Sequence, residues 1–196
     1  MITHGKAGRP RDQGATGTIL RAALALGEEL GFDGVTIEGI AARAGVGKTT
    51  IYRRWPNAWA VVMDAFLEDV TRIAPVQDRA TARESFIVSM KLVAKSFRGR
   101  HGKILRPLIG RAQIDENLRK AMTERWLMPR RQRSREIVRR AIGAGELRKG
   151  LEPDVVLDAL YGPLYHRLLV PYGEVKLTDS YVESLVNMVF DGLEPR

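Results

Sequence analysis

The residues whose types and spacing could do chemistry are concentrated in one run, VGKTTIYRRW, from Val46 to Trp55. If the run is helical, one of its faces carries polar side chains, those of Lys48, Thr49, Tyr52 and Arg53. Lysine and arginine bind phosphates and guanine edges, threonine offers a hydroxyl and a methyl group, and tyrosine donates to a phosphate. The opposite face carries Ile51 and Trp55 one turn apart and can face a core. The run therefore predicts a helix that lies in the DNA major groove.

The same run admits a second chemistry, because Gly47, Lys48 and Thr49 match the second half of a phosphate-binding loop. That motif needs another glycine at position 42, where this chain has Ala42, and it must follow a buried strand. The residues before it, TIEGIAAR, have a helical pattern instead. A nucleotide-hydrolysing enzyme is therefore the alternative from a different class, and tight nucleotide binding that Lys48→Ala abolishes would favour it.

Other patterns of catalysis or metal binding are missing from the sequence. The three histidines lack metal-site spacing, there is no cysteine, and neither HExxH nor GxSxG occurs. We expect no catalytic residue, no metal site and no cofactor.

Two short helices are needed to position the polar face. Thr36 is the expected N-cap of the first, and Gly45 can take the positive φ of a sharp turn after it. A second helix is expected from Lys48 to Trp55, where Pro56 stops it. Two short helices joined by a glycine-containing turn define a helix-turn-helix, here from Thr36 to Trp55.

The rest of the chain has the same helical periodicity, which predicts an all-α fold of roughly nine helices. We expect a first helix at about 16–30, a further helix capped by Asn57, and long helices at about 82–98, 102–112, 115–142, 153–170 and 179–193. The predicted domains are a flexible basic arm (1–14), a DNA-binding domain (15–60) and a ligand-binding and dimerisation domain (61–196).

The net charge and the hydropathy of the chain limit the classes of partner that it is expected to bind. The 196 residues carry a formal net charge of +9, which favours a polyanionic partner such as nucleic acid. No apolar run reaches the roughly 18 residues of a membrane span, and the N-terminus lacks the apolar stretch of a secretory signal. We therefore expect a cytoplasmic protein without a membrane partner.

Residues 16–66 resemble the N-terminal domain of the TetR/AcrR family of bacterial regulators, through ILRAALAL, GFDGVTI, IAARAGV and TTIYRRWPN. The segments LDALYGPLYHRLLV and YVESLVNMVFDGL are similar to the family's ligand-binding and dimerisation domain. The resemblance implies a transcriptional repressor that binds a palindromic operator as a homodimer and is released by a small-molecule inducer. It places the DNA contacts at Thr36, Thr49, Thr50, Tyr52 and Arg53. Lys48 joins them by its chemistry and position.

The chain departs from the family pattern at two phosphate-binding positions. Gly47 stands where serine is usual, and Ala58 stands where a lysine is common. Basic residues of the arm, Arg9 and Arg11, could compensate by following the backbone or entering the minor groove. A solvated tail is the equal alternative for the arm.

Apolar and aromatic side chains of the middle helices are the candidates for a ligand pocket. The predicted ligand-binding residues are Phe86, Met90, Trp126, Tyr161, Tyr165 and His166. Gly162 and Pro163 break the helix beside the tyrosines, and such a kink can open space. The basic run from Pro129 to Arg140 is interpreted as a solvated helix face.

The last two helices are the expected dimer surface. The final helix carries an apolar ladder richer than one packing neighbour requires: Val182, Leu185, Val186, Val189 and Phe190. Two such helices from each subunit would form a four-helix bundle, the arrangement that the resemblance implies.

Overall fold

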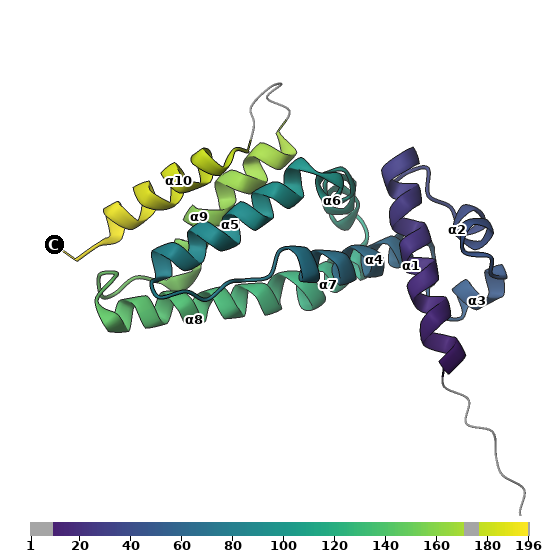
Figure 1. Cartoon of the computed structure of the whole chain (residues 1–196), viewed down its shortest axis with the longest axis horizontal. Helices are drawn as coiled ribbons and strands as arrows, with labels where there is room; N and C mark the ends of the chain where they lie inside the picture. The colour runs from purple at the N-terminus through teal and green to yellow at the C-terminus, as the bar shows by residue number, and fades with distance from the viewer. Residues whose placement is uncertain (1–9, 171–176, 196) are drawn as a thin grey trace, which may run out of the picture. The chain divides into compact units, whose positions relative to one another are not determined.

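The computed structural model describes residues 10–170 and 177–195, and every regular element in those ranges is a helix (Figure 1). The elements are α1 (Pro10–Leu30), α2 (Ile37–Ala44), α3 (Lys48–Tyr52), α4 (Ala58–Ile73), α5 (Ala82–Arg98), α6 (Arg100–Ala112), α7 (Glu116–Met122), the π-helix η1 (Thr123–Leu127), α8 (Met128–Ala144), α9 (Pro153–Leu169) and α10 (Asp179–Leu193). Because α7, η1 and α8 run on without a break, the described ranges form nine uninterrupted helical segments. The prediction of an all-α fold is confirmed.

The chain divides into two compact units, residues 1–66 and 67–196. The division falls inside α4, later than the predicted boundary after residue 60. A continuous helix therefore supplies its first turns to one unit and its last turns to the other.

Unit 1 contains α1, α2, α3 and the first part of α4. Its core includes Ile19, Ile40 and Ile51, all fully buried. Helix α1 begins at Pro10, before the predicted start at residue 16, because proline is well suited to the first turn of a helix. The predicted arm of residues 1–14 therefore overlaps the start of α1, and residues 1–9 lie outside the described ranges.

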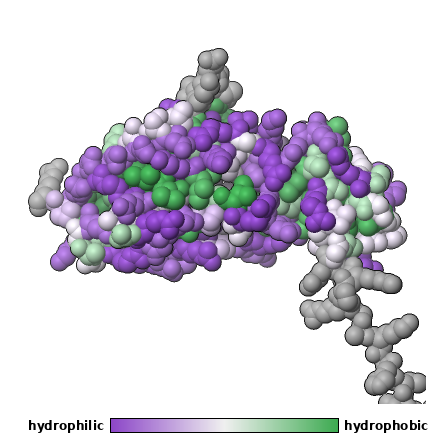
Figure 2. Space-filling model, viewed as in Figure 1, coloured by the Kyte–Doolittle hydropathy of each residue, from purple (hydrophilic) through white to green (hydrophobic). Residues whose placement is uncertain are grey.

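Unit 2 packs α5, α8, α9 and α10 against one another, with α10 lying along α5 (Figure 1). Thr81 and Glu84 form a reciprocal capping box that starts α5. The core of the unit includes Phe86, Met90 and Phe190. Figure 2 shows hydrophobic side chains gathered in a band on the visible face of unit 2, with hydrophilic side chains around it. Among the described helices, none is long and apolar enough to cross a lipid bilayer.

Candidate DNA-reading helix and ligand cavity

The turn before α3 is built as the sequence predicts. The Thr36 hydroxyl accepts a hydrogen bond from the Gly39 N–H at 3.0 Å, and Gly45 ends α2 with a φ of 66°. Helix α2, not a strand, precedes Gly47, so the phosphate-loop alternative lacks the element that it needs. The two short helices and their turn form a helix-turn-helix.

Helix α3 is shorter than predicted, since it ends at Tyr52 rather than Trp55. The Arg54 N–H bonds to the Ile51 carbonyl three residues back, and Trp55 precedes Pro56, which disfavours helical backbone. Gly47 is the N-cap of α3 and provides no side-chain hydrogen bond. The departure at Gly47 thus leaves the start of α3 without a side-chain cap.

Most of the predicted DNA-contact residues in this motif are accessible to solvent. Five of them are exposed, namely Thr36, Lys48, Thr49, Tyr52 and Arg53, and Thr50 is half-buried. Ile51 and Trp55 face the core, as predicted. Arg9 lies outside the described residues, and so does the side chain of Arg11. Six predicted contacts therefore belong to the helix-turn-helix, and the arm's two arginine side chains lie outside what the structure describes.

Lys48 forms an ion pair that the sequence interpretation did not anticipate. Its Nζ lies 3.1 Å from Oε1 of Glu38 on α2, and both side chains are largely exposed. The Lys48 hydrogen bond contributes to holding the pKa of Glu38 below its ordinary value, after a backbone hydrogen bond within Glu38 itself. Glu38 therefore stays ionised at neutral pH and pairs with a lysine that is one of the predicted DNA contacts.

Polar contacts behind α3 fix its position in unit 1. The Trp55 Nε1–H donates to Oδ2 of Asp64 at 2.9 Å, and the Arg54 guanidinium donates to the Thr16 hydroxyl on α1. The Asn57 side chain caps α4 by accepting from the Ala60 N–H at 2.9 Å, as predicted. These bonds tie the short α3 to the two longer helices beside it.

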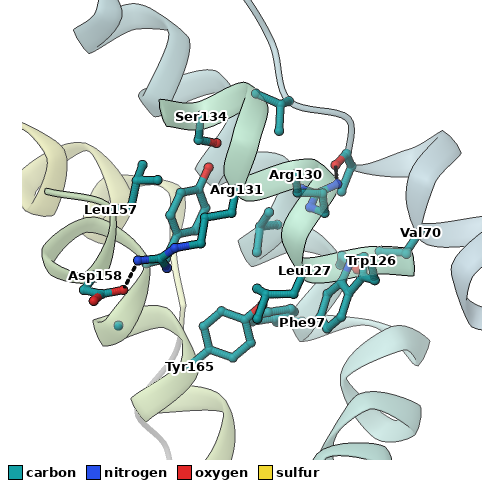
Figure 3. Close-up of a pocket in the computed structure, with 16 residues that line it drawn as sticks. Val70, Phe97, Trp126, Leu127, Arg130, Arg131, Ser134, Leu157, Asp158 and Tyr165 are labelled. Atoms are coloured by element: carbon teal, nitrogen blue, oxygen red, sulfur yellow. Dashed lines mark hydrogen bonds and ion pairs between the residues drawn. The ribbon is translucent and has the colours of Figure 1, made fainter. Parts of the chain in front are cut away.

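Unit 2 contains a cavity of about 270 Å³ beside α9 (Pro153–Leu169), a helix that runs on through Pro163. Its wall is mainly apolar and comes from the end of α4, α5, η1, α8 and α9; Figure 3 labels Val70, Phe97, Trp126, Leu127, Arg130, Arg131, Ser134, Leu157, Asp158 and Tyr165. Gly162, beside Pro163 in α9, also lines the cavity. This volume is slightly below the ~300–1,000 Å³ range of small-molecule sites.

Two arginines on α8 stand in the wall with different partners. Nη2 of Arg131 lies 2.8 Å from Oδ1 of Asp158 (Figure 3). Arg131 also pairs with Asp154. Arg130 instead donates to the backbone carbonyl of Ala74, just past the end of α4. Burial lowers the pKa of Arg130 from its ordinary value, while Tyr161 and Tyr165 act in the opposite direction.

The tyrosine hydroxyls of the wall are buried, although each tyrosine as a whole residue is half-buried. Burial raises the pKa of Tyr161, against opposing effects from Arg130 and Ser134, and burial raises the pKa of Tyr165 to about 12. Both hydroxyls therefore stay protonated at neutral pH and remain hydrogen-bond donors.

Three of the six predicted ligand residues line this cavity: Trp126, Tyr161 and Tyr165. Phe86 and Met90 differ from the prediction because they are buried in the core, where the Phe86 ring lies 6.0 Å from that of Phe190. His166 is exposed and is not part of the wall.

The interpretation of the basic run as a solvated face is wrong for its first residues. Arg130 and Arg131 line the cavity, and Arg135 pairs with Asp154 at 2.9 Å. Helical spacing holds a signal for Arg130, which falls one turn after Trp126 and one turn before the buried Ser134. An arginine in line with two buried residues is unusual, because charged side chains are rarely placed on the buried side of a helix.

The apolar ladder of α10 is also used differently from the prediction. Val182, Leu185, Val186 and Phe190 are buried within this single chain, where α10 packs on α5. A shallow hollow between α9 and α10 is instead lined by Val155, Val156, Ala159, Met188 and Val189. Val155 and Met188 are 65% and 66% exposed.

A helix-turn-helix unit followed by a second helical unit is an architecture found in DNA-binding proteins. Family models agree with both units. Residues 19–58 match the model for bacterial regulatory proteins of the tetR family, and residues 76–189 match the tetracyclin repressor-like C-terminal domain. The chain therefore belongs to the tetR family of bacterial transcription regulators and is a DNA-binding regulator rather than an enzyme.

Individual relatives extend this similarity over nearly the whole chain. The HTH-type transcriptional regulator YdeS of Bacillus subtilis (strain 168) is 41% identical over 189 residues, which cover 96% of this chain and 94% of YdeS. The DNA-binding transcriptional repressor TetR of Mycobacteroides abscessus is 26% identical, with 91% and 93% covered. The crystal structure of the TetR family regulator SCO0332 superposes with a TM-score of 0.76 at 31% identity, covering 92% of this chain and 99% of that one.

Proposed function

We propose that the chain is a dimeric repressor that binds a palindromic operator and releases it when a small molecule occupies the cavity of unit 2. The proposal rests chiefly on α4. This helix begins at Ala58, directly after the helix-turn-helix, and its last part supplies Val70 to the cavity wall. Occupancy of the cavity therefore acts on the helix that follows the reading motif.

DNA reading is assigned to the outer side of the helix-turn-helix, through Thr36, Lys48, Thr49, Thr50, Tyr52 and Arg53. The hydroxyl, ammonium and guanidinium groups there suit phosphates and major-groove base edges. We assign the basic arm, with Arg9 just before α1 and Arg11 in its first turn, to the flanking backbone or minor groove. Operator DNA places this activity in the bacterial cytoplasm.

Dimerisation is assigned to α9 and α10, as in the sequence prediction but through different residues. The exposed Val155 and Met188 and the hollow between them form an apolar surface that the single chain leaves uncovered. Because the ladder of α10 already packs on α5, these outer residues carry the proposed contact. The name of the Mycobacteroides abscessus relative supports repression as the mode of regulation.

Selection of bound duplexes from a random pool tests the proposal. A dimer should select an inverted repeat with half-site centres ~34–36 Å apart, and its affinity should fall steeply as salt rises. The selected duplex then serves to screen small molecules for release of the protein. A single half-site, or no consensus at all, would contradict the dimeric repressor.

A further inference from the structure

The wall of the cavity in unit 2 carries one more positive than negative side chain. Arg131 and Asp158, which both line it, pair with each other at 2.8 Å. Arg130 lines it too, yet in the described parts of the chain no carboxylate lies within ion-pair distance of its guanidinium. Its hydrogen bond goes to the carbonyl of Ala74, which carries no net charge. A cation in an apolar wall is unfavourable unless an anion accompanies it.

Unused hydroxyl groups stand in the same wall. Ser96 is only 5% exposed, and its Oγ has no hydrogen-bond partner among the described residues. The same holds for the Tyr161 hydroxyl, which Ser134 approaches without reaching ordinary hydrogen-bond geometry. Buried polar groups in native proteins are nearly always satisfied, so these two indicate a missing partner.

We propose that the cavity binds a small molecule with an apolar body and one anionic head, a carboxylate or a sulfonate, which pairs with Arg130. The inference rests on the proposed effector function of this cavity and names the class of effector. The guanidinium offers a fork of N–H donors that matches the oxygens of such a head, and the Tyr161 hydroxyl adds a neutral donor. A neutral molecule would leave Arg130 unpaired, and a cation would be repelled.

The walls specify the body of this ligand. Phe97, Trp126 and Leu127 lie on one side of the cavity (Figure 3). A second cavity of about 390 Å³ shares Trp126, Leu127 and Tyr165 with the first and is lined further by Ile109, Met122 and Leu169. An apolar body can therefore continue past Trp126, which lies on the wide π-helical turn of η1.

Head-group binding also changes the attachment of α4. The anion attracts the same guanidinium whose Nη1 donates to the Ala74 carbonyl, so movement of Arg130 toward the ligand lengthens that bond. Capture of Arg130 by the ligand weakens the link between α8 and the end of α4. The ligand thereby acts on the helix whose first turns belong to the DNA-binding unit.

Two fluorescent probes with the same body test the charge requirement in the full-length protein. 8-Anilinonaphthalene-1-sulfonate carries a sulfonate, and N-phenyl-1-naphthylamine has the same rings without it. We expect the sulfonate to bind about tenfold more tightly, as fits a charge-assisted contact. Arg130→Gln should remove that preference while leaving affinity for the neutral probe within about twofold.

Matched variants separate the site from general charge and from misfolding. Arg133→Gln removes an exposed arginine nearby on α8 and should leave the preference intact. Arg130→Lys keeps the charge and should retain part of the preference. Unchanged binding of the neutral probe shows that the cavity of Arg130→Gln is folded. Equal affinity for both probes in the native protein, or a preference that survives Arg130→Gln, overturns the inference.

DNA release is measured separately with the selected duplex. If the Arg130-dependent preference is present but the bound sulfonate leaves DNA affinity unchanged, the ligand class stands and the effector function fails. If a neutral molecule releases DNA and the preference is absent, the effector function stands and the inference fails.

Discussion

Nε2 of His101 lies 2.8 Å from Oδ2 of Asp69, and both side chains are buried in unit 2. Asp69 is near the end of α4, and His101 is the second residue of α6. Arg72 and Arg100 bind the same carboxylate. One aspartate therefore fastens the end of α4 to the start of α6, on the helix that we propose carries the signal.

Removal of the Asp69 charge should destabilise the protein in a pH-dependent way. Burial raises the pKa of Asp69, but hydrogen bonds from Arg72, His101 and Arg100 outweigh it and bring the pKa below its ordinary value. The stabilisation is therefore complete above the unfolded-state pKa of about 3.9 and is lost as pH falls through the lower folded-state pKa. Asp69→Asn should lower the free energy of unfolding by about 1.5–3 kcal/mol at pH 7.

Urea denaturation from pH 7 to pH 3 measures this difference between Asp69→Asn and the native chain. The difference should shrink below about pH 4. Asp78→Asn is the matched control, because Asp78 pairs with Arg140 on the exposed surface and should change stability little. An equal loss at every pH would show that packing, not charge, is responsible.

The Glu38 carboxylate should weaken DNA binding by competing for Lys48. A DNA phosphate that binds Lys48 must either displace the Glu38 carboxylate, which lies 3.1 Å from Nζ, or share the ammonium with it. Both arrangements are less favourable than binding a lysine without a carboxylate beside it. Glu38→Gln should therefore raise operator affinity by roughly two- to fivefold, the range of an exposed ion pair. Fluorescence anisotropy with the selected duplex measures the gain. Glu29→Gln removes a charge that pairs with Arg43 instead and should give a smaller gain.

Serine at position 47 should strengthen the reading helix. Gly47 has a φ of −71°, and a Cβ there would meet only the Thr49 hydroxyl at 3.6 Å. Gly47→Ser adds the missing N-cap and should raise stability by a few tenths of a kcal/mol, with tighter DNA binding. Thermal unfolding and anisotropy measure the two effects.

The contrasting variant is Gly45→Ser, two residues earlier. Gly45 has a φ of 66°, which side chains with a Cβ rarely adopt, so this change should cost about 1 kcal/mol. If the two serine variants behave alike, the cap geometry assigned to the turn is wrong.

Removing the hydroxyl of either of two buried serines on α5 should change the stability of the protein differently. Ser85 donates to the Thr81 carbonyl at 2.7 Å and accepts from the Arg79 N–H at 2.9 Å. Ser85→Ala should cost about 1–3 kcal/mol because it leaves a partner unsatisfied. Ser96→Ala removes a hydroxyl without a partner and should leave stability unchanged or higher. Urea denaturation of both variants decides whether Ser96 is held for a ligand rather than for the fold.

The outer face of α9 and α10 should control the oligomeric state. Met188→Glu places a charge on the apolar surface proposed as the dimer contact and should yield monomers by analytical ultracentrifugation. Ile114→Glu is the control, since Ile114 is 78% exposed in the turn between α6 and α7. A Met188→Glu dimer as stable as the native one would remove this face from the proposal.

Local features of the sequence predicted local features of the fold. The caps at Thr36 and Asn57 and the turn at Gly45 depend on neighbours within a few residues, so residue type and spacing suffice to find them. The inward side of the helix-turn-helix followed from the same spacing, with Ile51 and Trp55 buried.

Features that depend on distant partners were not predictable in this way. Periodicity shows that Phe86 and Tyr161 face inward, but only the packing of α5, α9 and α10 decides that Phe86 fills the core and Tyr161 borders a cavity. Arg130 was grouped with the solvated arginines because its partner, the Ala74 carbonyl, lies 56 positions away in the chain. Likewise, Val182, Leu185, Val186 and Phe190 of the α10 ladder are buried within the single chain, where α10 packs on α5.

The Arg130 contact with Ala74 has a consequence for how this protein can vary. Its acceptor is a main-chain oxygen, which every amino acid at position 74 supplies equally. A substitution at position 74 changes the side chain but keeps the carbonyl acceptor. The link to α8 therefore does not restrict the residue type at that position. Of the two partners, only Arg130 contributes a side chain to the contact, so only position 130 requires a particular residue type for it.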